Sequence, residues 1–98
     1  MLVKVGFLLR PEARPGKGPE LAAFLEQGRE LVMTESGTVT WYAFRVSDTE
    51  YGIFDTFESD DAREAHHAGE LAKALGSAAP ELLAGAPEVR RVQIVAAK

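Results

Sequence analysis

The fold of this chain is constrained most by the order of its strand-like and helix-like hydrophobic patterns. The alternation and the β-branched and aromatic content typical of strands occur in four segments, residues 3–10, 38–46, 50–57 and 89–96. Apolar residues spaced three and four positions apart, as on one face of a helix, occur in residues 19–34 and 60–75. The order strand–helix–strand–strand–helix–strand predicts an α+β, ferredoxin-like fold. Right-handed crossovers would place both helices on one face of a four-stranded antiparallel sheet.

Single residues predict where the helices begin and end. Pro19 suits the first turn of the first helix, where a missing N–H costs nothing. Ser59 or Asp60 can cap the second helix, and Gly76 is expected to end it. The segment that follows, residues 77–87, predicts one short additional helical turn before the last strand.

Length, charge and cysteine content restrict the class of protein. A chain of 98 residues is predicted to form a single domain over residues 1–98. The formal net charge of −4 and the scattered Lys and Arg residues argue against nucleic acid as a partner. The absence of cysteine excludes disulfides, thiolate metal sites and cysteine nucleophiles. No apolar stretch is long enough to span a membrane, no signal peptide is evident, and the cytoplasm is the expected location.

The strands carry apolar residues on both faces, although the two helices can cover only one face. In the second strand Trp41 points opposite to Tyr42 and Phe44, and in the third strand Phe54 points opposite to Ile53. A large exposed apolar face usually marks an interface. We therefore expect two copies to pair sheet against sheet as a two-fold homodimer, the alternative being a monomer with scattered surface aromatic residues.

Three stretches carry a resemblance to a known family: "YGIFDTF" (residues 51–57), "REAHHAGELAKAL" (63–75) and "PELLAGAPEVRRVQIVAAK" (80–98). The chain resembles the antibiotic biosynthesis monooxygenase domain family, whose members belong to the dimeric α/β-barrel superfamily. The resemblance implies a homodimer of ferredoxin-like subunits, a dimeric α/β barrel with a pocket between each sheet and its helices. It also implies that molecular oxygen oxidises a small aromatic molecule, a quinol or a polyphenol, with no metal, flavin or haem cofactor.

His66 is the candidate catalytic residue. The family pattern R-x-A-H matches residues 63–66 one by one, so the resemblance assigns the role to His66. A neutral imidazole can take a proton from a phenol or a hydroquinone. The alternative is a boundary histidine with no chemical role. Its neighbour His67 points about 100° away around the helix and is expected to be solvated. Adjacent histidines lack the i, i+4 spacing of a helical metal pair, so no metal site is predicted.

Aromatic residues and one carboxylate are the candidates for the substrate pocket: Trp41, Tyr42, Phe54, Asp55 and Phe7. Strand parity allows only one of Trp41 and Tyr42 to face a pocket, and the sequence does not decide which. The aromatic residues could equally belong to the core or to the dimer interface. Asp55 interrupts an apolar strand and needs a partner. It could orient a histidine or a substrate hydroxyl, but the favoured interpretation is an ion pair with Arg45 on the neighbouring strand.

Three functional hypotheses follow from these observations. The first is a cofactor-independent monooxygenase in which His66 handles the proton of a small aromatic substrate. The second is a non-catalytic dimeric module of the same fold that binds a small ligand or a partner protein. An isomerase or stress-type barrel protein would also use His66 as a base and would need no oxygen. Haem degradation is disfavoured, because the chain contains no Asn and its only Trp lies on the second strand.

Overall fold

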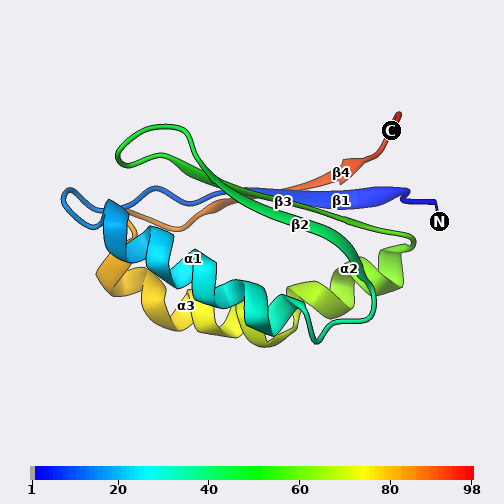
Figure 1. Cartoon of the computed structure of the whole chain (residues 1–98), viewed down its shortest axis with the longest axis horizontal. Helices are drawn as coiled ribbons and strands as arrows, with labels where there is room; N and C mark the ends of the chain where they lie inside the picture. Colours follow the sequence, from blue (N-terminus) through cyan, green and yellow to red (C-terminus); the bar gives the residue numbers. More distant parts are fainter. Residues whose placement is uncertain (1) are drawn as a thin grey trace.

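The computed structural model describes residues 2–98 as a four-stranded antiparallel sheet with helices on one face (Figure 1). The elements follow one another in the order β1 (Val5–Arg10), α1 (Gly18–Val32), β2 (Thr38–Arg45), β3 (Tyr51–Phe57), α2 (Asp60–His67), α3 (Glu70–Leu82) and β4 (Glu88–Gln93). Across the sheet the strands lie in the order β2-β3-β1-β4, and each neighbouring pair is antiparallel. The predicted ferredoxin-like α+β fold is confirmed.

The helical region after β3 differs from its prediction. Ser59 caps α2, since its hydroxyl accepts a hydrogen bond from the Ala62 N–H at 3.1 Å. That helix ends at His67, and α3 then continues past Gly76 as far as Leu82. The predicted helix end at Gly76 and the separate short turn after it are therefore wrong.

The position of the helix break has a packing cause. A Cβ atom at Gly69 would lie 2.9 Å from Oε2 of Glu35 and 3.2 Å from the carbonyl oxygen of His66. Gly76 has no atom within 4 Å of its own Cβ position and faces solvent. A glycine there lowers helix propensity but does not stop a helix whose flanking residues are packed. The chain therefore breaks where a neighbouring segment approaches closely.

The core fills the space between the sheet and the helices. Its larger cluster joins the apolar faces of α1 and α3 to the inner face of β3, and it includes Leu21, Leu25, Tyr51, Ile53 and Leu75. A smaller cluster consists of Val5, Phe7 and Phe57. The apolar face predicted for α1 is confirmed, because the buried residues of this helix follow the expected spacing. None of the helices within residues 2–98 is long and apolar enough to cross a membrane.

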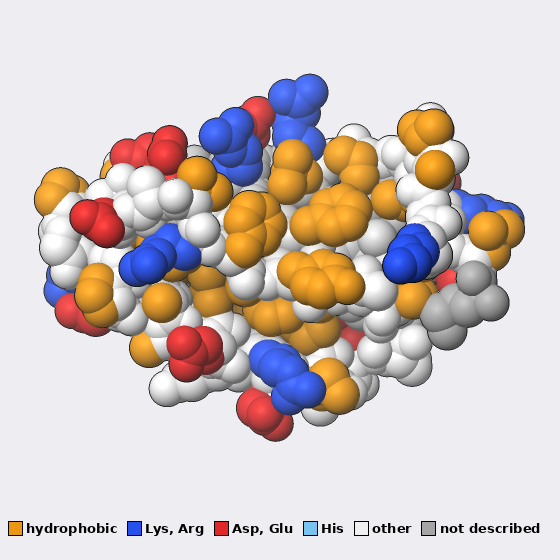
Figure 2. Space-filling view, turned by 45° about the horizontal axis from the view of Figure 1, so that its top comes forward, with side chains coloured by type: hydrophobic (Ala, Val, Ile, Leu, Met, Phe, Trp, Pro, Cys, Tyr) orange, Lys and Arg blue, Asp and Glu red, His pale blue; other side chains and the backbone are white. Residues whose placement is uncertain are grey.

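The opposite face of the sheet carries exposed aromatic side chains (Figure 2). Tyr42 is 60% exposed and Phe44 is 42% exposed. The register places Tyr42 beside Phe54, and Phe54 beside Leu8. The ring of Phe44 lies over Gly52, where a Cβ atom would overlap it. We call Leu8, Tyr42, Phe44 and Phe54 the outer patch.

The substitution Gly76→Ala is expected to raise the free energy of unfolding by about 0.5–1 kcal/mol, because alanine has the higher helix propensity. The added methyl group meets no atom within 4 Å. Chemical denaturation followed by circular dichroism measures the change.

The matched control is Gly28→Ala in α1, whose methyl group would lie 2.8 Å from Cδ1 of Leu71. This variant is expected to gain less stability or to lose some, because Leu71 must move. A lower stability of Gly76→Ala than of the wild type would contradict a continuous α3.

Candidate active site

The register of the sheet gathers several candidate residues into one row. Trp41 on β2 lies opposite Asp55 on β3, and Asp55 lies opposite Phe7 on β1. Directly opposed residues of antiparallel strands point to the same face, and this row faces the helices. His66, the buried residue of α2, packs against the same region. Its ring centroid lies 5.3 Å from that of Phe57 and 6.4 Å from that of Phe7.

The His66 imidazole lies between two carboxylates. Its Nδ1 is 2.5 Å from Oε1 of Glu35, and its Nε2 is 3.0 Å from Oδ2 of Asp55. Among the described residues Oδ2 has no well-aligned hydrogen-bond donor, although its 3.0 Å separation from Nε2 is within hydrogen-bond range. We call Glu35, His66 and Asp55 the carboxylate–imidazole chain.

Backbone and hydroxyl groups hold the two carboxylates in place. The Asp55 side chain is fully buried, and its Oδ1 accepts a hydrogen bond from the Phe7 N–H at 3.3 Å. The Thr38 hydroxyl donates to Oε1 of Glu35 at 2.7 Å. Each end of the chain is thus fixed by the sheet and not only by the imidazole.

The two carboxylates determine the protonation state of His66. Burial by itself would lower the pKa of the imidazole, because a buried cation loses its hydration. The contacts with Asp55 and Glu35 outweigh burial, and the pKa of His66 is raised above its ordinary value. Because a protonated imidazole donates and cannot accept, the capacity to take a further proton belongs to the whole carboxylate–imidazole chain and not to His66 alone.

The predicted ion pair between Asp55 and Arg45 is wrong. The register places Arg45 opposite Tyr51, whereas Trp41 occupies the position opposite Asp55. Arg45 is exposed and is the last residue of β2, away from the position opposite the buried carboxylate. Asp55 instead contacts His66, which is the alternative that the sequence left open.

His66 separates two hollows of different size. The inner cavity, on the Asp55 side, has a volume of about 40 Å³, and its walls include Phe7, Trp41, Asp55, His67 and Leu71. The outer cleft, on the Glu35 side, has a volume of about 360 Å³, and its walls include Thr34, Glu35, Ser36, Ala65 and Glu70. His66 lines both. The inner cavity can hold a water molecule or a diatomic gas, but not an aromatic ring.

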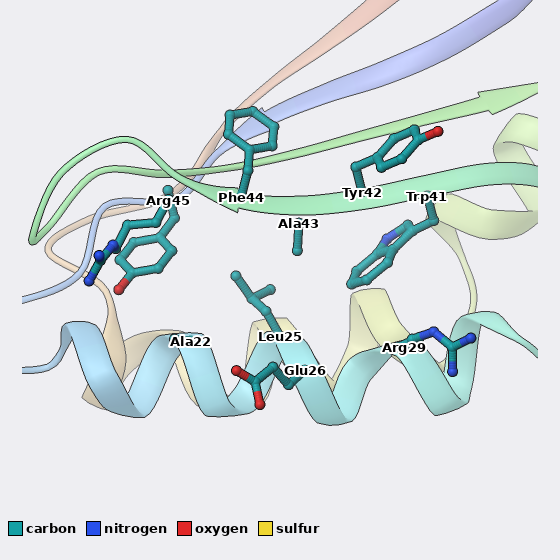
Figure 3. A pocket seen from close by; sticks show the side chains of 10 residues that line it. Ala22, Leu25, Glu26, Arg29, Trp41, Tyr42, Ala43, Phe44 and Arg45 are labelled. Atoms are coloured by element: carbon teal, nitrogen blue, oxygen red, sulfur yellow. The ribbon is translucent and has the colours of Figure 1, made fainter.

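A larger groove opens at the free edge of β2, between this strand and α1 (Figure 3). Its volume is about 490 Å³. Leu25 and Trp41 point into it, whereas Tyr42 and Phe44 point to the other side of β2 (Figure 3). Trp41 also lines the inner cavity, so its indole lies between the groove and the carboxylate–imidazole chain.

The structure brings together four of the six predicted site residues, namely His66, Asp55, Phe7 and Trp41. The other two, Tyr42 and Phe54, lie side by side in the outer patch, on the face away from His66. Trp41 is therefore the member of the Trp41–Tyr42 pair that faces the helices. His67 is exposed as expected, but its ring centroid also lies 5.3 Å from that of Phe7.

Sequence reasoning did not single out Glu35. It lies in the turn "ESG" between α1 and β2, 31 residues before His66, and acidic residues are ordinary in such turns. The available signal is a pair of glycines that lets this turn approach the helices. A Cβ atom at Gly37 would lie 3.1 Å from Cβ of Ala62, and one at Gly69 would lie 2.9 Å from Oε2 of Glu35.

The carboxylate–imidazole chain does not have the geometry of a metal site. Glu35 and Asp55 contact opposite nitrogens of the ring, so their oxygens do not converge on one point. Within residues 2–98 no three His, Asp or Glu side chains are grouped so that they could hold a metal ion.

Comparison with known proteins identifies relatives among solved structures. The chain matches no protein-family model and no curated protein. NE2512, a protein of unknown function from Nitrosomonas europaea, is 38% identical with a TM-score of 0.96, and the match covers 98% of this chain and 93% of that one. A proposed antibiotic biosynthesis monooxygenase from Caulobacter crescentus is 23% identical with a TM-score of 0.82, over 96% of this chain and 92% of that one. Another, from Nitrosomonas europaea, is 8% identical with a TM-score of 0.84, over 94% and 99%.

The free energy of unfolding is expected to fall as the pH rises above about 6.5. Because the pKa of His66 is raised in the folded protein, its stabilising effect is complete below the ordinary pKa and is lost as the pH rises through the folded pKa. Each unit by which folding raises the pKa contributes about 1.4 kcal/mol to the free energy of unfolding. Urea denaturation at a series of pH values measures the slope.

Two variants identify the source of this slope. Asp55→Asn removes one of the carboxylates that raise the pKa, so its stability should depend less on pH. His67→Gln alters the exposed neighbouring histidine and should keep the wild-type slope. A wild-type stability that rises across this range would contradict the charged imidazole.

Proposed function

Because the chain belongs to the same family as the NE2512 protein of Nitrosomonas europaea and has the fold of the antibiotic biosynthesis monooxygenases, we propose that it is a cofactor-independent monooxygenase. Its substrate is a small electron-rich aromatic molecule, a quinol or a polyphenol. Residues 1–98 act as one domain, in the cytoplasm, as a homodimer. The observation that carries the proposal is a buried acid–base group beside a cavity with aromatic walls.

The first step in this proposal is removal of a phenolic proton. Asp55 and His66 both line the inner cavity, and in the proposal the substrate hydroxyl reaches them after Trp41 moves aside. The neutral form of His66, with its proton on Nδ1 beside Glu35, can accept the phenolic proton at Nε2 through Asp55. These groups lie in a site that excludes water.

The second step is direct reaction of the deprotonated ring with dioxygen. Deprotonation makes the ring electron-rich, so that it can reduce oxygen without a flavin or a metal. For a hydroquinone, the substrate supplies all four electrons that dioxygen accepts. One oxygen atom forms a new carbon–oxygen bond and yields a hydroxyquinone, and the other oxygen leaves as water with two protons from the substrate. The balance requires no further reductant.

The groove between α1 and β2 supports a binding place for the aromatic ring. It is large enough for one or two fused rings, whereas the inner cavity suits only dioxygen or water. In the proposal the ring enters the groove, and the indole of Trp41 moves aside so that the hydroxyl reaches Asp55 and His66. Trp41 is the natural gate because it lines both spaces.

One observation favours the second candidate, a non-catalytic module that binds a small ligand. The groove is open, yet Trp41 separates it from His66 in the present arrangement. A ligand could occupy the groove without ever reaching the carboxylate–imidazole chain. The chain would then serve only to stabilise the fold.

A panel of hydroquinones and polycyclic phenols distinguishes the two candidates. For a substrate, the monooxygenase consumes oxygen, and His66→Gln and Asp55→Asn reduce kcat by about 10²–10⁴. Asp61→Asn is the matched control, because Asp61 is an exposed carboxylate in the first turn of α2. It should retain wild-type activity. Oxygen electrode measurements give the rates.

Binding can be measured separately from catalysis. Trp41 is the only tryptophan, so its indole N–H gives a single cross-peak in a ¹H–¹⁵N NMR spectrum. A ligand that shifts this peak without oxygen uptake would favour the binding module. Oxygen uptake that persists in His66→Gln and in Asp55→Asn would contradict the proposed role of the chain.

The outer patch supports the homodimer. Aromatic side chains gather in the middle of this face, and Lys, Arg, Asp and Glu side chains lie mainly around it (Figure 2). An apolar centre with a polar rim is typical of a protein interface. Pairing two copies through this face would remove Tyr42 and Phe44 from water.

The substitution Tyr42→Glu is expected to weaken the dimer by about 2 kcal/mol or more, roughly 30-fold in the dissociation constant. The cause is the burial of an added carboxylate from each subunit in an apolar interface. Sedimentation equilibrium at micromolar concentration measures the change. Met33→Glu, at a similarly exposed position after α1, should leave the dimer unchanged. A wild-type chain that sediments as a single subunit would contradict the dimer.

A further inference from the structure

Glu35 has so far been given no role of its own, although its contact with His66 is the shortest in the site. Its Oε1 lies 2.5 Å from Nδ1, and its side chain is 18% exposed. The next members of the carboxylate–imidazole chain are progressively more buried: the His66 side chain is 9% exposed and the Asp55 side chain is 0% exposed. The chain therefore runs inward from a carboxylate that meets solvent to one that does not.

The two hollows lie at the two ends of this chain. Glu35 lines the outer cleft, Asp55 lines the inner cavity, and His66 lines both. The walls of the inner cavity also include Leu9, Leu71 and Leu75, so little water can carry a proton directly to Asp55. The proton that Asp55 takes from the substrate must leave while oxygen reacts and must return when water forms, and the outer cleft is the wider space on the other side of the imidazole.

Imidazole is suited to such a route because it has two nitrogens that can each bind a proton. A neutral ring with its proton on Nδ1 can accept a proton at Nε2 and release the one on Nδ1. The ring then transfers one proton without moving through space. Here the two nitrogens face different carboxylates on different sides, which is the arrangement that this exchange requires.

A purely orienting role would not require a carboxylate at position 35. The Thr38 hydroxyl lies 3.5 Å from Nδ1 and already holds Oε1 of Glu35. Other titratable groups face the site but do not continue the chain. His67 lines the inner cavity, and Glu70 lines the outer cleft, where its carboxylate lies 3.8 Å from Nζ of Lys73.

We propose that Glu35 is the outer end of a proton path that runs through His66 to Asp55 and connects the outer cleft to the inner cavity. When the substrate is deprotonated, the phenolic proton passes through Asp55 to Nε2 of the neutral imidazole, the Nδ1 proton passes to Glu35, and Glu35 releases it to the cleft. The same path returns a proton to the site when water forms, which restores the starting tautomer. The inference rests on the proposed monooxygenase function for its use, but not for its geometry. Glu35 is a positioning and proton-relay residue and does not touch substrate.

The first test needs no substrate. In ¹⁵N-labelled protein, transfer of magnetisation from water to the ring N–H protons of His66 measures how fast they exchange with solvent. Glu35→Gln keeps an oxygen acceptor but cannot carry a proton, so exchange should slow by about tenfold or more. Glu35→Asp retains a carboxylate and should show an intermediate rate.

Glu70→Gln is the matched control, because it makes the same change in the same cleft without contact to His66. It should exchange at the wild-type rate. If Glu35→Gln exchanges as fast as the wild type, or faster, the proton path is wrong. A backbone NMR fingerprint shows that each variant is folded, and Glu35→Asp serves if Glu35→Gln is not.

A second test uses any substrate that the quinol panel yields. Glu35→Gln should lower kcat with little change in KM and should move the pH profile, whereas Glu70→Gln should do neither. Turnover that depends on His66 but is unaffected by Glu35→Gln would overturn the path and leave the monooxygenase standing. If no substrate is found, slow exchange in Glu35→Gln would still support the path while the monooxygenase fails.

Discussion

The structure depends on how one carboxylate is accommodated inside the sheet. Asp55 lies in the middle of β3, an interior strand, and its side chain is fully buried. An ionised carboxylate left alone in such a place would cost several kcal/mol. The Phe7 N–H and the His66 imidazole supply the compensation, and Glu35 and Thr38 lie beside the other nitrogen of the imidazole. The groups around this one buried charge thus come from β1, β3, α2 and the turn before β2.

The two faces of the sheet carry different groups of side chains. Trp41 and Tyr42 are consecutive, yet the first faces the helices and the second lies in the outer patch. The same parity separates Asp55 from Phe54 on β3. The side that holds the acid–base group is therefore independent of the side that is available for a second subunit, although the two share the same backbone.

The element order and the strand faces could be predicted from the sequence, because both follow from local periodicity. His66 was singled out through the resemblance, because residues 63–66 match the family pattern R-x-A-H. The register could not be predicted, and so Asp55 was matched with Arg45 when its true neighbour across the strand is Trp41. Glu35 and the break at Gly69 depend on the approach of segments far apart in the chain, which leaves no periodic trace. Gly76 shows the converse, since a glycine in a packed helix need not end it.

The buried charge also bears on how the strands align while the protein folds. Side chains alternate between faces, so a shift of β3 by one residue would turn Asp55 outward and bring Phe54 or Thr56 beneath His66. The imidazolium would then lack its interior counter-ion, and Glu35 alone would oppose it. A misaligned sheet carries that penalty and the native alignment does not. The carboxylate–imidazole chain therefore favours the native register over its neighbours, whether or not it takes part in catalysis.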